Sequence, residues 1–205
     1  DVSNEKFKFR DSRRMFVGGV PAIINRISFT GELGYEIYVA PHYQLKLYEE
    51  LMEAGKEFNI KPFGGRALMS MRLEKNWGAW TLDYRPDFTA KETGLDAFIN
   101  WDKEFIGKES AQKENSSNKL VPLIVETNEI DVTNNEAVLN GDQSIGYVTS
   151  GGFAHFVNKS VAFTFVDQKN IKSENKIQVE INGDLFNCSI IKEPLYDPSG
   201  QKMRS

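Results

Sequence analysis

The chain has 205 residues, enough for one large domain or two small ones, and either size can bury a real hydrophobic core. Its 25 basic and 29 acidic residues give a formal net charge of -4 and are scattered along the sequence, which argues against a nucleic-acid partner. No apolar run approaches the roughly 20 residues that span a bilayer, so a membrane partner is not expected either.

The first predicted elements are short strands. Apolar runs at residues 15–17 and 22–24 are separated by glycines and a proline, a pattern typical of β-structure. Two more β-rich runs, residues 27–29 and 35–39, flank Gly31, Glu32 and Gly34, and together they predict a strand, a tight turn and a strand. A carboxylate held at such a turn can accept two parallel hydrogen bonds from a flat, amidine-like edge. The alternative is an ordinary hairpin turn whose Glu32 is solvated.

Two helices are expected next. Residues 43–58 place apolar side chains at helical spacing opposite a charged face, which predicts an amphipathic helix that ends near Gly55 and covers one face of the sheet. A second helix is expected over residues 64–75. Because this stretch has little polar face, we expect it to be buried between other elements. Its charged side chains Arg66, Arg72 and Glu74 then need partners.

Residues 76–95 lack clear periodicity and are rich in aromatic side chains, a composition typical of a functional loop. A short strand is expected at residues 97–99 and a short helix at residues 105–112. The small polar residues at 113–118 then indicate a linker.

Beyond the linker, the sequence predicts only β-structure. Two Asn-Gly-Asp triplets, at residues 140–142 and 182–184, are typical of hairpin turns. Six short β-rich runs suggest a small antiparallel barrel, closed or nearly closed: residues 120–127, 137–139, 144–149, 160–166, 176–181 and 185–191. The expected fold class is therefore α+β, with a split near residue 116 into an α+β part and a six-stranded barrel.

Several kinds of site have no support in the sequence. There is no nucleophile elbow, and the paired glycines are not spaced as a phosphate-binding loop or a dinucleotide fingerprint requires. His42 and His155 lack ligand spacing, so we expect no metal site. The single Cys188 cannot form an intramolecular disulfide, which fits a reducing compartment, and we expect it to be a small core residue.

Four stretches carry a resemblance to a known family. They are residues 29–36 (FTGELGYE), 65–75 (GRALMSMRLEK), 105–108 (FIGK) and 193–198 (EPLYDP). In order and spacing, they resemble the tetrahydrofolate-dependent aminomethyltransferases of the glycine-cleavage T-protein family. The nearest branch is the folate-binding C-terminal part of the dimethylglycine and sarcosine dehydrogenases and oxidases. The resemblance implies that residues 1–115 are the C-terminal part of the folate-binding domain and residues 116–205 the C-terminal barrel domain.

The resemblance also implies a folate site. Glu32 is the pterin-binding carboxylate by this comparison, and Trp77 falls where relatives place an aromatic residue of the same pocket. Tyr84 and Arg66 are further candidates, since a pterin needs ring faces and its glutamate tail needs cations. One departure is Leu68, where the T-protein helix carries an arginine; Arg66 lies two residues earlier. For Arg66, an ion pair with Glu74 or Asp83 is an equally open interpretation, and for Arg72 and Glu74 we favour structural pairing.

The implied reaction transfers a one-carbon unit to tetrahydrofolate, giving 5,10-methylenetetrahydrofolate. The family's catalytic aspartate lies in its N-terminal region, so no catalytic residue is assigned here, and the chain is expected to be an inactive fragment by itself. FAD is expected only on a domain preceding residue 1, and the location is expected to be the cytoplasm, or the mitochondrial matrix in a eukaryote. The alternative is a binding or scaffold module that keeps the fold without folate chemistry. The one-carbon donor and the oligomeric state stay open.

A last expectation concerns residues 149–155 (TSGGFAH). Relatives carry a similar run here, beside the folate site. We expect a loop that faces the domain junction near residues 77–85 and closes one side of the pocket without supplying a catalytic group; the alternative is a surface hairpin.

Overall fold

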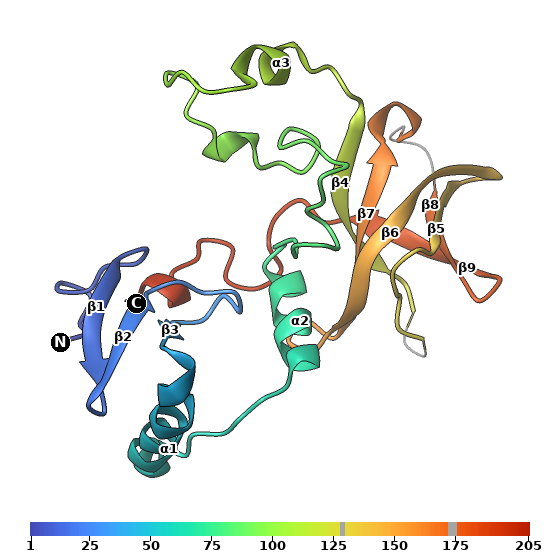
Figure 1. Cartoon of the computed structure of the whole chain (residues 1–205). Coiled ribbons are helices and arrows are strands. Elements are labelled where there is room, and N and C mark those ends of the chain that lie inside the picture. Colours follow the sequence, from blue (N-terminus) through green and yellow to red (C-terminus); the bar gives the residue numbers. More distant parts are fainter. Residues whose placement is uncertain (128–129, 172–175) are drawn as a thin grey trace. The chain divides into compact units, whose positions relative to one another are not determined.

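The computed structural model describes residues 1–127, 130–171 and 176–205 (Figure 1). The chain forms two compact units, each described here by itself. The first comprises Asp1–Met71 with Asp197–Ser205, and the second comprises Arg72–Tyr196. The domain boundary expected at residues 115–116 does not coincide with this division and stays a prediction. Among the described residues, no helix has the length and apolar character needed to span a membrane.

The first unit is built on a three-stranded antiparallel sheet in the order β1-β2-β3. The strands are β1 (Ser12–Val17), β2 (Val20–Asn25) and β3 (Glu36–Tyr38). This confirms the strands expected at residues 15–17 and 22–24. Burial alternates along β2, and one face of the sheet packs into a small core around Phe7, Ala22 and Ile24.

The hairpin predicted around Glu32 is wrong. Strand β3 pairs directly with β2, so residues 26–35 form a connecting loop and residues 27–29 are not a strand. Two local hydrogen bonds explain the difference: the Gly31 N–H donates to Ser28 Oγ at 3.0 Å, and the Glu32 N–H donates to Thr30 Oγ1 at 3.3 Å. Hydroxyl side chains that bond nearby backbone groups compete with a strand ladder.

Three helical elements follow the sheet: η1 (Pro41–Tyr43), α1 (Gln44–Ala54) and η2 (Lys56–Phe58). The expected amphipathic helix and its end at Gly55 are confirmed, and Leu47 is its buried side chain. Helix α2 (Gly65–Glu74) also forms where expected, but its burial is limited to Arg72, Leu73 and Glu74 in the last turn. The expectation of a helix buried along its length was therefore too broad.

In the second unit, residues 76–95 form the irregular loop that the sequence predicts. The strand expected at residues 97–99 is wrong, because η3 (Asp96–Phe98) is a single helical turn closed by hydrogen bonds from Phe98 and Ile99. Helix α3 (Lys108–Lys113) occupies the second half of the helix expected at residues 105–112.

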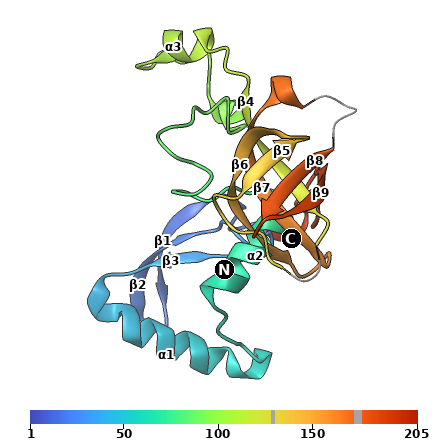
Figure 2. The same cartoon turned by 90° about the vertical axis from the view of Figure 1, so that its right-hand side faces the viewer.

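The predicted six-stranded antiparallel barrel is confirmed, and it is closed (Figures 1 and 2). Its strand order is β4-β7-β6-β5-β8-β9, and β4 pairs with β9 to complete the circle. Two further short turns, η4 (Gln168–Asn170) and η5 (Lys202–Arg204), lie outside the barrel strands. The strands are β4 (Asn118–Val125), β5 (Ala137–Asn140), β6 (Gln143–Ala154), β7 (Lys159–Asp167), β8 (Ile177–Ile181) and β9 (Asp184–Ile190).

Strand β6 is longer than predicted. It continues through Ala154, so most of the loop expected at residues 149–155 is strand. The two Asn-Gly-Asp turns connect β5 to β6 and β8 to β9, as the sequence indicates. Inside the barrel, apolar side chains such as Leu123, Val138, Val148 and Val179 are at most 1% exposed and form the main core.

Candidate functional site

The loop that carries Glu32 has a defined backbone. Gly31 is buried with φ +88°, a conformation that glycine adopts at little cost. Gly34 packs so closely that a Cβ atom would lie 2.9 Å from the Ile27 carbonyl oxygen. Glu32 itself is half-buried, and its backbone N–H is held by Thr30. The glycines therefore fix the backbone on both sides of the carboxylate, although not through the hairpin that the sequence suggested.

Arg66 is exposed near the start of α2, in the same unit as Glu32. The ion pair considered for it, with Glu74 or Asp83, would join the two units and stays a prediction. Within the second unit, both carboxylates bind other donors. Asp83 pairs with Arg72, and Glu74 accepts hydrogen bonds from the backbone N–H groups of Phe156, at 2.6 Å, and Val157.

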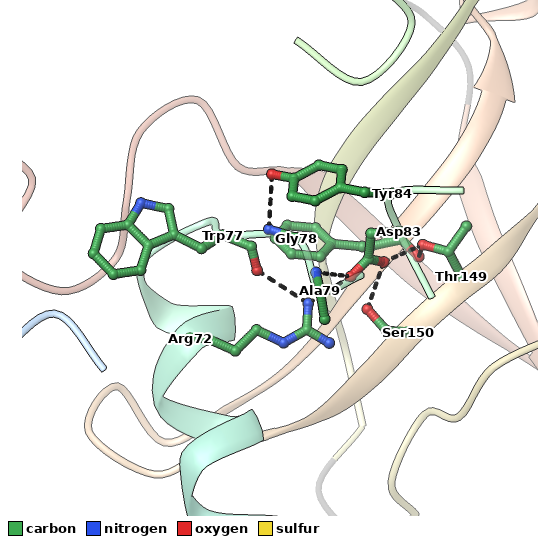
Figure 3. Close-up of polar contacts among 9 residues, drawn as sticks. Arg72, Trp77, Gly78, Ala79, Asp83, Tyr84, Thr149 and Ser150 are labelled. Atoms are coloured by element: carbon green, nitrogen blue, oxygen red, sulfur yellow. Dashed lines mark hydrogen bonds and ion pairs between the residues drawn. The ribbon is translucent and has the colours of Figure 1, made fainter. Parts of the chain in front are cut away.

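Asp83 lies at the centre of a buried polar network in the second unit (Figure 3). Arg72 Nη1 donates to its Oδ2 at 2.7 Å, and the Ala79 N–H donates to the same oxygen at 2.8 Å. The hydroxyls of Thr149 and Ser150 donate to its Oδ1, the second at 2.7 Å. Helix α2, the loop at residues 77–85 (called here the aromatic loop) and strand β6 thus meet at one carboxylate. This confirms that part of the segment at residues 149–155 contacts the aromatic loop.

The Arg72 side chain is 1% exposed; its Nη1 atom is paired with Asp83, whereas its Nε atom has no hydrogen-bond partner among the described residues. Burial lowers the pKa of its guanidinium, and the adjacent Asp83 carboxylate opposes this effect. Its Cζ atom lies 5.3 Å from the centre of the Phe163 ring, a cation–π distance. Arg72 is therefore paired, as the structural interpretation of this residue expects.

The same network holds the aromatic loop. Arg72 Nη1 donates to the Trp77 carbonyl oxygen at 3.1 Å, and the Gly78 N–H donates to the Tyr84 hydroxyl oxygen at 3.1 Å (Figure 3). The Tyr84 ring lies so close to Gly78 that a Cβ atom there would be 2.5 Å from its Cζ atom. Burial raises the pKa of the Tyr84 phenol, and this hydrogen bond opposes the increase. Tyr84 is therefore a neutral phenol packed closely against Gly78.

Trp77 is half-buried beside a cation. The Nζ atom of Lys75 lies 5.6 Å from the centre of the Trp77 ring and 5.9 Å from that of Tyr196. Tyr196 belongs to the closing segment of the unit, and its N–H donates to the Glu74 carbonyl oxygen at 2.9 Å. Trp80, by contrast, is 76% exposed and contacts the Tyr84 ring edge-on.

The chemistry of these groups is that of binding. Asp83 is occupied by four donors, so it has no lone pair aimed at a ligand. Among residues 1–127, 130–171 and 176–205, no group of three His, Cys, Asp or Glu side chains is arranged to hold a metal ion. The sequence predictions missed the central role of Asp83. Two features of the sequence could have indicated it: Arg72, on a helix expected to be buried, needs an acidic partner, and Asp83 is an acid in the aromatic loop.

Of the four predicted folate-binding residues, Glu32 and Arg66 lie in the first unit, and Trp77 and Tyr84 lie in the second. Within the second unit, Trp77 and Tyr84 are both tied to the short segment at residues 77–79. Their shared role in one site stays a prediction.

Two family models match the chain in order. Residues 1–103 match the GCVT N-terminal domain, and residues 118–197 match the glycine cleavage T-protein C-terminal barrel domain. The mitochondrial dimethylglycine dehydrogenase of Mus musculus is 35% identical over 95% of this chain, and the Homo sapiens protein is 34% identical over the same share. An aminomethyltransferase of Thermoanaerobacter pseudethanolicus is 31% identical over 98% of the chain.

A solved structure shows the same fold. The glycine cleavage system aminomethyltransferase T of Bartonella henselae matches with a TM-score of 0.82 at 23% identity and covers 96% of this chain and 55% of that protein. The present chain spans 23% of the length of the two dehydrogenases and 55% of the T. pseudethanolicus enzyme.

Proposed function

Because the chain belongs to the glycine cleavage T-protein family, we propose that it contributes to a tetrahydrofolate-dependent one-carbon transferase. Within the family, we place it in the dimethylglycine and sarcosine dehydrogenase or oxidase branch. The match to two mammalian dimethylglycine dehydrogenases across 95% of the chain carries this proposal. The one-carbon unit would come from an N-methylglycine, and the product would be 5,10-methylenetetrahydrofolate.

Residue types on each unit support the folate proposal. Glu32 offers a half-buried carboxylate on a backbone fixed by glycines, suited to the planar aminopyrimidinone edge of a pterin. Trp77 and Tyr84 offer aromatic faces on a loop held by buried hydrogen bonds. Arg66 is an exposed cation suited to the carboxylates of the glutamate tail.

When bound, tetrahydrofolate supplies the nitrogen atoms that accept the one-carbon unit. In our proposal, the residues of this chain bind and orient it: Glu32 fixes the pterin edge, and Trp77 and Tyr84 hold the ring face. We assign no catalytic proton transfer to the chain. Asp83, the most buried acid of the second unit's network, is committed to its four donors.

We assign no FAD site to this chain, whose sequence holds no spaced-glycine dinucleotide fingerprint. We propose that FAD belongs to another domain of a longer protein, which the 23% coverage of the dehydrogenases supports. By the same comparison, we propose a mitochondrial-matrix location in a eukaryote and a cytoplasmic one otherwise.

The test is calorimetry with folinic acid on the natural full-length protein and its Glu32→Ala variant. Losing a charge-assisted contact to the pterin should weaken binding by roughly 10- to 100-fold, the scale of about 1.5–3 kcal/mol. Glu57→Gln, at an exposed carboxylate in η2 of the same unit, is the matched control and should bind as the wild type does.

Leu68 supports a second candidate, a scaffold module that keeps the fold without folate chemistry, because the resemblance to the T-protein helix implies an arginine where this chain has Leu68. Unchanged affinity in the Glu32→Ala variant would remove Glu32 from the site. Absence of folinic acid binding by the wild-type protein would favour the scaffold.

A further inference from the structure

Strand β6 contains a β-bulge at Thr149. Val148 pairs with Thr164 on β7, and Ser150 pairs with the next residue, Phe163, so Thr149 is an extra residue without a partner of its own in the register. In a regular strand, consecutive side chains point to opposite faces of the sheet. A bulge changes the local twist and can re-aim a side chain.

The bulge coincides with an unusual contact. The hydroxyls of the consecutive residues Thr149 and Ser150 both donate to the same oxygen of Asp83, and Figure 3 shows both side chains directed at that carboxylate. Thr149 is 5% exposed and Ser150 is 4% exposed, so neither hydroxyl has bulk water as an alternative partner. The irregular register thus lets two neighbouring side chains bind one acid.

Hydrogen bonds connect Asp83 to the rest of its own loop. The N–H groups of Asp83 and Tyr84 both donate to the Ala79 carbonyl oxygen, at 2.9 and 3.1 Å, and the Ala79 N–H returns a bond to the Asp83 carboxylate. Thr81 N–H donates to the Tyr84 carbonyl oxygen at 3.0 Å. Residues 79–84 therefore form a closed turn whose only buried acid is bonded to the barrel.

The aromatic side chains follow that turn. Tyr84 comes directly after Asp83, and its hydroxyl accepts the Gly78 N–H. The Trp77 carbonyl is bonded to Arg72, which is itself paired with Asp83. Displacing Asp83 would release these contacts together.

We propose that Thr149 and Ser150 are positioning residues for the aromatic loop: through Asp83 they hold Trp77 and Tyr84 in the orientation that binds folate. This inference rests on the proposed function. It extends it, because the two hydroxyls are proposed to act through the Asp83 carboxylate and not by binding folate themselves; Thr149 Oγ1 also lies 3.2 Å from the Phe163 carbonyl oxygen of β7, which anchors it to the barrel.

The experiment compares the Thr149→Val/Ser150→Ala double variant of the natural full-length protein with Thr164→Val. Thr164 is a matched control: it is fully buried on the neighbouring strand, and its hydroxyl donates to the Val121 carbonyl oxygen at 2.8 Å, away from Asp83. Each change removes buried hydroxyls at nearly constant shape, so both should lower stability.

The expected results distinguish a loss of loop positioning from a general loss of protein stability. The double variant should bind folinic acid roughly tenfold more weakly, because a small displacement of binding groups has large effects, whereas Thr164→Val should keep its affinity. Amide hydrogen exchange in residues 77–84 should accelerate in the double variant alone. Thr149→Ser, which keeps a hydroxyl at the bulge, should restore both affinity and protection when paired with wild-type Ser150.

The Trp77→Ala variant separates the positioning role of Thr149 and Ser150 from the role of the aromatic loop in folate binding. If it weakens folinic acid binding while the double variant binds normally, the positioning role is overturned and the proposed function stands. If Trp77→Ala also binds normally, the aromatic loop is not part of the folate site and the positioning role is overturned, whereas the proposed function is then decided by wild-type binding and the Glu32→Ala variant. Should the double variant fail to fold, the single Ser150→Ala variant is held to the same criteria.

Discussion

At the scale of the residue, the Asp83 carboxylate is buried and its acceptor sites are all used by hydrogen-bond donors of the protein. Its carboxylate is 0% exposed and accepts from a guanidinium, a backbone N–H and two hydroxyls. A buried charge is tolerated when it is paired and hydrogen-bonded, and the four donors around this carboxylate meet that condition.

The sequence predicted that Arg72 would need a partner but could not say which acid would bind it. Partner choice depends on tertiary placement: Arg72 lies in the buried last turn of α2, whereas Arg66 lies in its exposed first turns. Glu32 was predicted as a binding residue because its turn resembles a family motif, and that role stays a prediction; its half-buried environment depends on contacts that no spacing rule contains.

Cys188 yields a prediction about pH. Its thiol packs against the barrel core, and burial raises its pKa to about 12. The folded-state pKa lies above the unfolded value, so the stability contributed by the neutral thiol is present below about pH 9. It declines as the pH rises from there toward 12.

The measurement is the free energy of unfolding from pH 8 to 10.5 for the wild type and for Cys188→Ala. The wild type should lose stability faster than the variant, by at most roughly 1.4 kcal/mol per pH unit. Parallel curves would show that the thiol titrates alike in both states.

At the scale of the element, β6 organises the second unit. It pairs with β5 and β7, carries the bulge at Thr149 and supplies both hydroxyls that bind Asp83. Its alternating apolar residues made the strand predictable. Its full length was not, because the glycines at positions 151 and 152 resemble a turn and the tertiary ladder with β7 overrides that local signal.

Strand β6 also gives a prediction about packing. A Cβ atom on Gly146 would lie 2.1 Å from the Phe165 carbonyl oxygen and 2.9 Å from Val166 Cα, both of them backbone atoms of β7. Gly146→Ala should therefore force the two strands apart and cost about 2 kcal/mol or more in the free energy of unfolding.

Gly152→Ala is the control on the same strand. Its Cβ atom would meet Leu73 Cδ1 at 3.5 Å, an ordinary contact, so denaturant unfolding should show a much smaller loss. Equal losses in the two variants would mean that the close β6–β7 approach at Gly146 is not what limits substitution.

The wrong prediction of a hairpin around Glu32 also shows tertiary pairing overriding a local β signal. Residues 27–29 have β propensity, but β3 takes the place beside β2, and the hydroxyls of Ser28 and Thr30 bond the backbone of the glycine turn. Short β-rich runs specify a strand only when a pairing edge is open to them.

At the scale of the whole molecule, the closed barrel was predictable because six alternating runs and two hairpin triplets agree with one another. The division of the chain was harder to predict. Asp197–Ser205 belongs with the first unit, and Arg26 donates to the Ser205 carbonyl oxygen at 2.9 Å. A return of the chain end after the barrel leaves no mark in local periodicity.

The central claim is that the aromatic loop of this chain binds folate. Tryptophan fluorescence of the natural full-length protein during titration with folinic acid tests it most directly, using Trp77→Phe and, as the control outside the loop, Trp101→Phe. The account predicts saturable quenching in the wild type and in Trp101→Phe, largely lost in Trp77→Phe, because a pterin stacked at the loop quenches the nearest indole. Saturable quenching that persists undiminished in Trp77→Phe, or no saturable signal in the wild type, would contradict it.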